Sequence, residues 1–182
     1  RRARLLGRVF QDPMMGTAGN MGIEENLAMA YRRGKTRTLR WGITNEEREL
    51  YRQKLKMLEL GLEDRLSAKV RRQALTLLMA TLQNPRLLLL DEHTAALDPK
   101  TAHKVLTLTE KIVCENSLST LMVTHNMKDA IRYGNRLVMM HEGNIIYDVS
   151  GEEKKGLKVS DLLAKFEAAS SGEFANDRML LA

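Results

Sequence analysis

The chain has 182 residues, of which 43% are hydrophobic, 29% charged and 4% aromatic, and its 29 Lys and Arg against 23 Asp and Glu give a net charge of +6. An intrinsically disordered chain is excluded, because it would contain fewer apolar residues. A membrane-spanning chain is also excluded, since no apolar run approaches the roughly 20 residues that a helix needs to cross a bilayer. The single cysteine, Cys114, excludes a disulfide framework and suits a reducing compartment.

The chain opens with Arg1-Arg2-Ala3-Arg4, without an initiator Met or the apolar segment of a signal peptide. We therefore expect residues upstream of Arg1 to be missing from this sequence. Basic residues cluster over 32–40, next to Trp41. They form either a patch for nucleic acid or anionic lipid, or a solvated loop, and the lack of an aromatic platform favours the loop.

The first half of the chain predicts one strand end and then helices. Arg8-Val9-Phe10 ends a strand, and glycines at 16, 19 and 22 mark a loop before a helix over Ile23–Tyr31. Thr44 and Glu47 have the spacing of a capping box and start a second helix. Its apolar residues follow a helical period, and Gly61 can end it. This stripe consists of Tyr51, Leu55, Leu58 and Leu62.

After a third helix over Ala74–Leu82, the pattern changes to alternating strands and helices. Leu87–Leu90 and Thr120–Val123 are short apolar runs, typical of strands buried on both faces of a parallel sheet. Between them, Asp98 as the N-cap and Pro99 in the first turn predict a helix that runs to about Asn116. Strand, helix and strand in this order indicate an α/β fold.

The last part of the chain predicts a short helix, a hairpin and a final helix. The short helix covers Met127–Tyr133, and strands over Arg136–Met140 and Ile145–Val149 flank the turn residues Glu142-Gly143-Asn144. Ser160 is expected to cap the last helix, Asp161–Ala169.

Two adjacent carboxylates, Asp91 and Glu92, follow the leucine run. Ligands of open α/β sheets bind at the carboxyl ends of the strands. There, one acid can hold Mg²⁺ beside a nucleotide phosphate, while the other orients or deprotonates the attacking water. The alternative is a strand end that becomes polar as it reaches solvent.

His125 follows the next strand and Gln11 follows the first one. If the strands are neighbours, His125 can face Asp91 and Glu92 and bond to a terminal phosphate or the attacking water. The amide of Gln11 could reach a metal-bound water. The alternatives are a helix cap or buried imidazole for His125 and an ordinary loop residue for Gln11. His93 fits no zinc-ligand spacing and is interpreted as part of its loop.

Four segments occur in the order found in ABC-type ATPases, and together they resemble that family over nearly the whole chain. They resemble the Q-loop, the Walker B strand with its catalytic Glu, the D-loop and the H-loop; these segments are Phe10–Pro13, Leu87–Glu92, Ala95–Asp98 and Val123–His125. More narrowly, Leu88–Lys100, Thr124–Ala130 and Gly172–Leu181 resemble the ATP-binding component of bacterial importers for tryptophan, tyrosine or similar small solutes.

The resemblance implies a role for each site residue. Asp91 would help to hold Mg²⁺ through water, and Glu92 would be the general base. His125 would contact the γ-phosphate of ATP and support the attacking water. Gln11 would sense the metal and couple the sheet to the helical part, and Asp98 would lie at the contact between two ATPase subunits, in addition to capping its helix.

The resemblance also implies a fold and a set of partners. The fold would be a P-loop NTPase-like ABC ATPase, with a partial parallel sheet and an inserted helical subdomain. Residues 1–16 would end the catalytic core, 17–83 would form the helical subdomain, 84–150 a RecA-like core, and 151–182 a C-terminal helical tail. The partners would be a second copy of the subunit, integral-membrane permease subunits contacted by the helical subdomain, and a separate extracytoplasmic solute-binding protein. We expect ATP and Mg²⁺ as cofactors, no nucleic acid, and a location at the cytoplasmic face of the cell membrane.

Two family motifs are missing. No G-x-x-x-x-G-K-[ST] loop occurs, since the glycines of 16–22 lack the Lys and Gly151–Gly156 is followed by Leu157-Lys158. In the family this P-loop lies upstream of the Q-loop. The LSGGQ signature is not intact. Either residues 66–70 form a degenerate signature or, in the interpretation that we prefer, a short glycine-rich segment is lacking between Val70 and Arg72. We therefore expect a chain that begins at Arg1 not to hydrolyse ATP by itself.

Two other functions stay open. The sequence pI of about 9.5 and the basic cluster would also suit a soluble, non-transport ABC ATPase that acts on nucleic acid or ribosomes. The loss of the phosphate-binding motifs would also suit an inactive interaction fragment.

Overall fold

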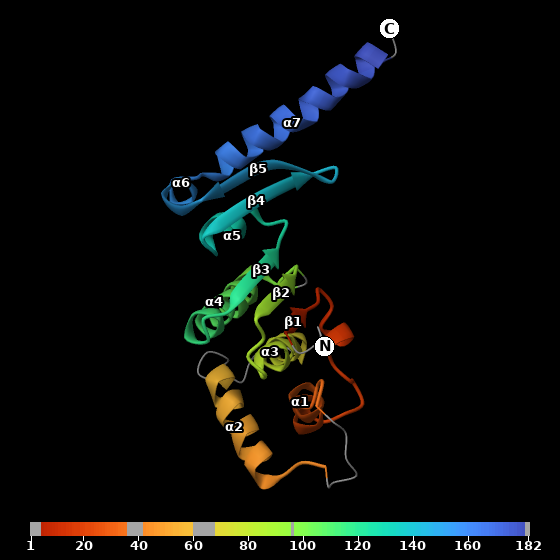
Figure 1. Cartoon of the computed structure of the whole chain (residues 1–182), viewed down its shortest axis with the longest axis vertical. Coiled ribbons are helices and arrows are strands. Elements are labelled where there is room, and N and C mark those ends of the chain that lie inside the picture. The colour runs from red at the N-terminus through yellow and green to blue at the C-terminus, as the bar shows by residue number, and fades with distance from the viewer. Residues whose placement is uncertain (1–4, 36–41, 60–67, 96, 181–182) are drawn as a thin grey trace. The chain divides into compact units, whose positions relative to one another are not determined.

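A computed structural model describes residues 5–35, 42–59, 68–95 and 97–180, with side chains for 5–35, 42–56, 72–95 and 97–170. The chain divides into two compact units, Arg1–Val123 and Thr124–Ala182, and each is considered by itself. Figure 1 shows the elements of each unit along the chain.

The first unit contains a three-stranded parallel sheet in the order β1-β2-β3. The strands are β1 (Leu6–Val9), β2 (Leu87–Asp91) and β3 (Ser119–Val123). Val9 of β1 is paired with Leu90, and Asp91 with Val123, so all three strands end at the same edge. The predicted α/β class and the predicted neighbourhood of the strands are confirmed.

Two helices cover one face of this sheet, α3 (Ala68–Thr81) and α4 (Pro99–Glu115). The apolar contact joins Val9, Leu88 and Leu90 of the strands to Leu77, Ala80 and Ile112 of the helices. β1 and α3 approach so closely that a Cβ atom on Gly7 would lie 2.4 Å from the carbonyl oxygen of Ala80. A glycine is therefore required at that position.

The opposite face of the sheet is open among the described residues. Leu87 and Leu89 are half-buried, whereas the side chains of Leu121 and Val123 are 59% and 51% exposed. The prediction that β3 is buried on both faces is therefore wrong. A run of apolar residues indicates that a strand can be buried on both faces. Whether it is buried depends on the layers that cover the sheet, which come from other parts of a fold.

Three helices pack together beside the sheet: α1 (Ile23–Tyr31), α2 (Asn45–Glu59) and α3. The predicted capping box is confirmed, because Glu47 N donates to Thr44 Oγ1 at 3.2 Å and Thr44 N donates to Glu47 Oε2 at 3.0 Å. Tyr51 is buried in their shared core, and Leu55 packs against it. The expected roles of Leu58, Leu62 and Gly61 fall outside the described side chains and residues, as does most of the signature-like segment 66–70.

The expected loop between β1 and α1 contains a short 3-10 helix, η2 (Pro13–Gly16), and one buried amide holds the rest of it. Asn26 of α1 accepts from Ala18 N at 2.8 Å and donates to the carbonyl oxygens of Ala18, Met21 and Gly22 at 3.0–3.1 Å. Asn26 is only 2% exposed. It therefore ties the loop to α1, and it is the hydrogen-bond acceptor for Ala18 N.

The second unit begins with α5 (Met127–Arg132) and continues with the antiparallel strands β4 (Arg136–His141) and β5 (Asn144–Ser150). The predicted hairpin is confirmed. Its turn consists of Glu142 and Gly143, whose φ angles of +45° and +79° suit a two-residue hairpin connection. Leu137, Val149 and Leu162 form the core of this unit.

Two helices complete the unit, α6 (Gly151–Lys155) and α7 (Val159–Leu180). The sequence did not predict α6, and α7 is longer than the predicted 161–169. Ser160 is not the cap, because it lies inside α7, and the Asp161 carboxylate accepts from Lys158 N at 2.8 Å instead. None of the helices in the described ranges is both long and apolar enough to cross a membrane.

We predict that Asn26→Ala lowers the free energy of unfolding by about 2–3 kcal/mol, because it removes the hydrogen bonds of a buried amide and leaves Ala18 N without its acceptor. Urea denaturation checks this. Asn20→Ala, at an exposed position of the same loop, is the matched control and should change stability by less than about 0.5 kcal/mol. Equal unfolding midpoints for the two variants would contradict the role of Asn26.

Candidate active site

The acidic pair lies at the carboxyl end of the central strand, as predicted. Asp91 is the last residue of β2, and its Oδ2 accepts from Arg8 Nη2 of β1 at 2.9 Å. The guanidinium of Arg8 also lies over the Phe10 ring, 4.5 Å from its centroid. About half of each charged side chain remains exposed. Asp91 is thus an accessible carboxylate with one cation already beside it.

Glu92 has an unusual backbone conformation, with a φ of +42°. This left-handed region is disfavoured for a residue with a Cβ atom and persists only where the surroundings impose it. Two backbone hydrogen bonds contribute: Glu92 N donates to Val123 O at 3.0 Å, and Glu92 O accepts from Ala95 N at 2.9 Å. The chain therefore turns sharply just past β2, at the predicted general base.

His93, the next residue of this turn, is buried. It is 2% exposed, and its Nε2 lies 3.2 Å from Oγ1 of Thr109 on α4. Burial lowers the pKa of His93 to about 4, so the imidazole is neutral. The sequence did not predict this contact. Nothing in the local pattern separates a buried histidine from a surface one, and the helical spacing that turns Thr109 inward is the only signal that could have indicated it.

Gln11 lies at the same edge of the sheet. It is exposed. Val9 and Leu90 are register partners, and Gln11 and Glu92 each lie two residues beyond them. Its neighbour Asp12 caps η2 by accepting from Met14 N at 2.9 Å. The structure thus brings Gln11 and the acidic pair to one edge, and the contact of Gln11 with a metal or water stays a prediction.

His125 follows β3 in the chain by two residues and belongs to the second unit. Next to it, Asn126 caps α5 by accepting from Lys128 N at 3.0 Å. The approach of His125 to Glu92 therefore stays a prediction.

Asp98 caps α4, as the sequence predicted. Its carboxylate accepts from Thr101 N at 3.1 Å, and hydrogen bonding from Thr101 holds the pKa of Asp98 below its usual value. The second role, at a contact between two subunits, stays a prediction.

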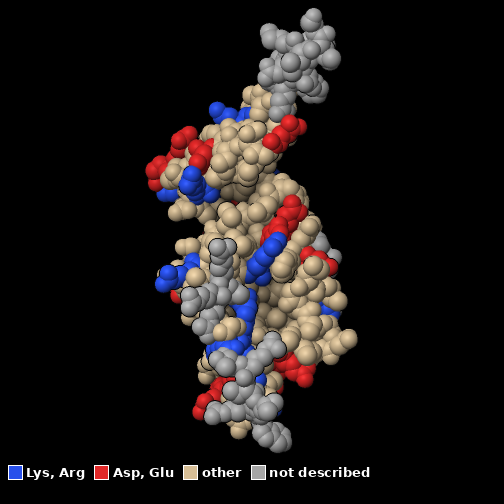
Figure 2. Space-filling view, turned by 45° about the vertical axis from the view of Figure 1, so that its right-hand side comes forward, with Lys and Arg blue, Asp and Glu red and all other residues tan. Residues whose placement is uncertain are grey.

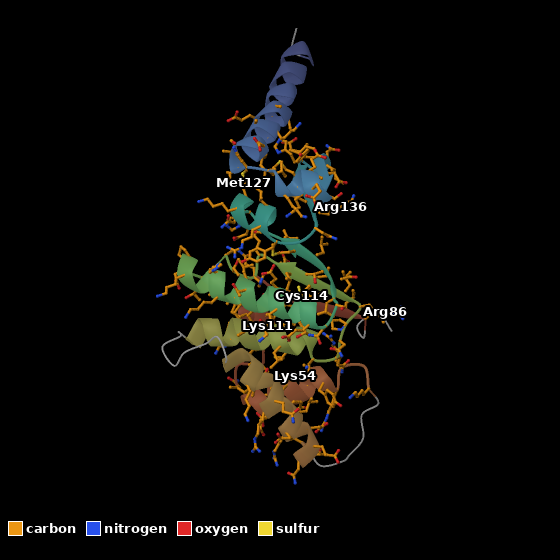
Figure 3. The ribbon with its side chains drawn as sticks, turned by 90° about the vertical axis from the view of Figure 1, so that its left-hand side faces the viewer. Lys54, Arg86, Lys111, Cys114, Met127 and Arg136 are labelled. Atoms are coloured by element: carbon orange, nitrogen blue, oxygen red, sulfur yellow. The ribbon has the colours of Figure 1, made fainter. Side chains whose placement is uncertain are left out.

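The described part of the basic cluster is engaged in contacts within the first unit. Arg32 pairs with Glu47 at 2.7 Å, Arg33 donates to Leu6 O at 3.0 Å, and Lys35 Nζ lies 3.4 Å from the centre of the Tyr31 ring. Residues 36–41 lie outside the described ranges. Figure 2 shows basic and acidic side chains interspersed on one face. Figure 3 shows Lys111 and Cys114 on α4, and both residues are exposed. The expectation that the chain binds no nucleic acid stays a prediction.

The donor set at the sheet edge fits a magnesium ion that is shared with a nucleotide. No group of three or more His, Cys, Asp or Glu in the described ranges could enclose a metal by itself. Magnesium needs no such group, because it keeps several waters and binds through one or two carboxylates together with phosphate oxygens. The carboxylate of Asp91, which is about half exposed, has the chemistry of such a ligand.

A parallel sheet with an acidic pair at its carboxyl edge defines a class of nucleotide-hydrolysing α/β proteins. No protein-family model matches the chain. Individual curated proteins do match it. The chain is 45% identical over 175 residues to the tyrosine transport ATP-binding protein of Clostridioides difficile, an alignment that covers 93% of this chain and 69% of that protein. It is 30% identical over 177 residues to a phosphonates import ATP-binding protein of Cupriavidus metallidurans, covering 95% and 60%.

Solved structures share the fold. The dimeric ATP-binding cassette MJ0796, bound to ADP and Pi in a post-hydrolysis state, matches 80% of this chain and 62% of its own, with 28% identity and a TM-score of 0.62. CbiO1 of Clostridium perfringens, part of the transporter complex CbiONQ, matches 97% and 66% with 20% identity and a TM-score of 0.66, a likeness of fold. The chain belongs to the ATP-binding proteins of ABC transporters, which have the P-loop NTPase fold. It spans between about 60% and 70% of the length of these relatives.

We predict a pH dependence of stability from His93. Its folded pKa of about 4 lies below the ordinary 6.5, so the unfolded chain binds more protons between these values. The stabilisation is therefore fully present above about pH 6.5 and is lost as the pH falls to 4, at a cost of about 3 kcal/mol.

Urea denaturation at about pH 7 and about pH 4 measures this loss. His93→Gln should remove that part of the pH dependence, whereas His103→Gln, at an exposed position of α4, should keep it. The same pH dependence in both variants would rule out the prediction.

Proposed function

We propose that this chain is the catalytic and coupling part of an ABC transporter ATP-binding subunit, which hydrolyses MgATP to drive solute import through a separate membrane permease. The observation that carries the proposal is the acidic pair at the carboxyl end of β2, with Asp91 facing the open side of the sheet and Glu92 fixed in a sharp turn. The 182 residues contain no P-loop, so the proposal applies to a cassette of the length of its relatives.

In this mechanism each residue does one task. Glu92 accepts a proton from the water that attacks the γ-phosphate, and His125 donates a hydrogen bond to that phosphate. Asp91 and Gln11 would hold a magnesium ion through water. When bound, the ion supplies positive charge to the phosphate oxygens. Arg8 orients the carboxylate of Asp91 through their 2.9 Å ion pair.

A set of exposed apolar side chains, here called the apolar patch, supports contact with a permease. It lies on η2, α1 and the loop between them, directly after Gln11, and its side chains are 46–70% exposed: Met14, Met15, Met21, Ile23 and Met29. Methionine side chains are flexible and polarisable and are common at protein-binding surfaces. The patch would thus connect the permease to the strand end that carries Gln11.

The solute class follows from the relative rather than from the site. The Clostridioides difficile protein is named for tyrosine transport, and we propose a small amino-acid-like solute for this chain as well. A homodimer, an extracytoplasmic solute-binding protein and a location at the cytoplasmic face of the membrane belong to the same proposal.

We predict that Glu92→Gln lowers the ATPase kcat of the complete protein by about 10²-fold or more, because the amide cannot accept the proton from water. A phosphate-release assay measures kcat. Glu110→Gln is the matched control, since Glu110 is exposed on α4, and it should retain wild-type activity. Equal activity of the two variants would reject Glu92 as the general base.

We also predict that Met15→Glu weakens binding to the permease, because it places a charge in the apolar patch. Co-purification with the permease should fall while the ATPase activity of the isolated subunit stays within about twofold of wild type. Leu163→Glu on α7, another exposed apolar position, is the control and should leave co-purification unchanged. Co-purification with ribosomes instead of a permease would favour the non-transport function.

A further inference from the structure

We propose that His93 is a positioning residue that holds Glu92 in its left-handed conformation by anchoring the turn after β2 to Thr109 of α4. This inference rests on the proposed function, because it assigns His93 a part in the hydrolysis of ATP through Glu92.

The backbone of Glu92 has a costly conformation. Its φ of +42° is costly for a residue with a side chain, by about 1 kcal/mol or more, so something must hold the turn. The hydrogen bond from Glu92 N to Val123 O fixes the start of the turn, and the one from Ala95 N to Glu92 O closes it, but neither of them joins the turn to α4. The next residue along the chain is His93, and it is buried.

The hydrogen bond between His93 and Thr109 has a defined direction. The hydroxyl of Thr109 has one proton, and it donates that proton to Val105 O at 2.8 Å. Oγ1 of Thr109 can therefore only accept from His93, which places the proton of the imidazole on Nε2, 3.2 Å away. The bond is specific, because an apolar side chain at position 93 could fill the space but could not donate.

Helix α4 provides a fixed anchor for this hydrogen bond. α4 is fixed at its start by the Asp98 cap and toward its end by Ile112 in the core under the sheet. Thr109 is 5% exposed and lies on that buried side of the helix. α4 packs on the same sheet that carries Glu92. The hydrogen bond from His93 to Thr109 therefore attaches the turn to a helix that is itself held by the sheet. The carboxylate of Glu92 is thereby held at the sheet edge.

Matched substitutions test this in the complete protein. Thr109→Val keeps the shape of the side chain and removes the acceptor, whereas Thr109→Ser keeps the acceptor. His93→Leu and His93→Gln form the corresponding pair on the donor side. Two quantities are measured for each variant: amide hydrogen exchange of the peptide that contains 92–95, and kcat and KM for ATP.

We expect Thr109→Val and His93→Leu to speed amide exchange in the turn by about tenfold and to lower kcat about tenfold, with KM for ATP within about twofold. Thr109→Ser and His93→Gln should stay within about threefold of wild type in both quantities. A general loss of stability would instead speed exchange throughout the first unit. If either His93 variant fails to fold, the Thr109 pair alone decides.

Three outcomes overturn the proposal. The first is equal exchange in Thr109→Val and Thr109→Ser. The second is faster exchange with unchanged kcat, which would mean that His93 orders the turn without serving catalysis. The third is a rise in KM with kcat unchanged. A wild-type protein without ATPase activity would refute the proposed function instead, and the exchange measurements would still show whether His93 holds the turn.

Discussion

The packing of Leu88 and Leu90 against α3 and α4 determines which way every other side chain of β2 points. Side chains alternate along a strand, so these two residues direct Leu87, Leu89 and Asp91 to the open face. A shift by one residue would turn the carboxylate of Asp91 into the apolar layer, where a charge is costly. The accessible carboxylate, its ion pair with Arg8 and the turn at Glu92 therefore all depend on this apolar contact.

Helix α3 transmits that constraint to the helical part of the first unit. Leu77 and Ala80 contact the sheet, while Ala74, Leu75 and Leu78 contact α1 and α2. Because α3 is buried on both sides, α1 and α2 cannot shift without disturbing its contact with β1 and β2. Gln73 of α3 also lies 3.5 Å from Phe10 O, next to Gln11. Helices α1 and α2 are thus joined through α3 to the strand ends.

The sequence predicted the features that local chemistry determines. The Thr44–Glu47 capping box, the Asp98 cap and the acidic end of β2 each depend on residues a few positions apart. The left-handed Glu92 and the buried His93 were missed, because they depend on Val123 and Thr109, which only the fold brings near. The burial of β3 was predicted wrongly for a related reason, since its exposure is decided by which layers cover the sheet. The relation of His125 to Glu92 remains a prediction.

One pattern joins the segments that follow the three strands: each contains or contacts a buried polar side chain. Asn26 holds the loop after β1, His93 holds the turn after β2, and Lys154 donates to the carbonyl oxygens of Ile131 and Tyr133 after β3. Apolar packing holds the strands, but it is not directional, and loops carry backbone groups that need partners. Hydrogen bonds from buried polar side chains satisfy those groups and fix the direction of the chain. Catalytic side chains on loops need this kind of support, because small displacements of a general base are costly in rate.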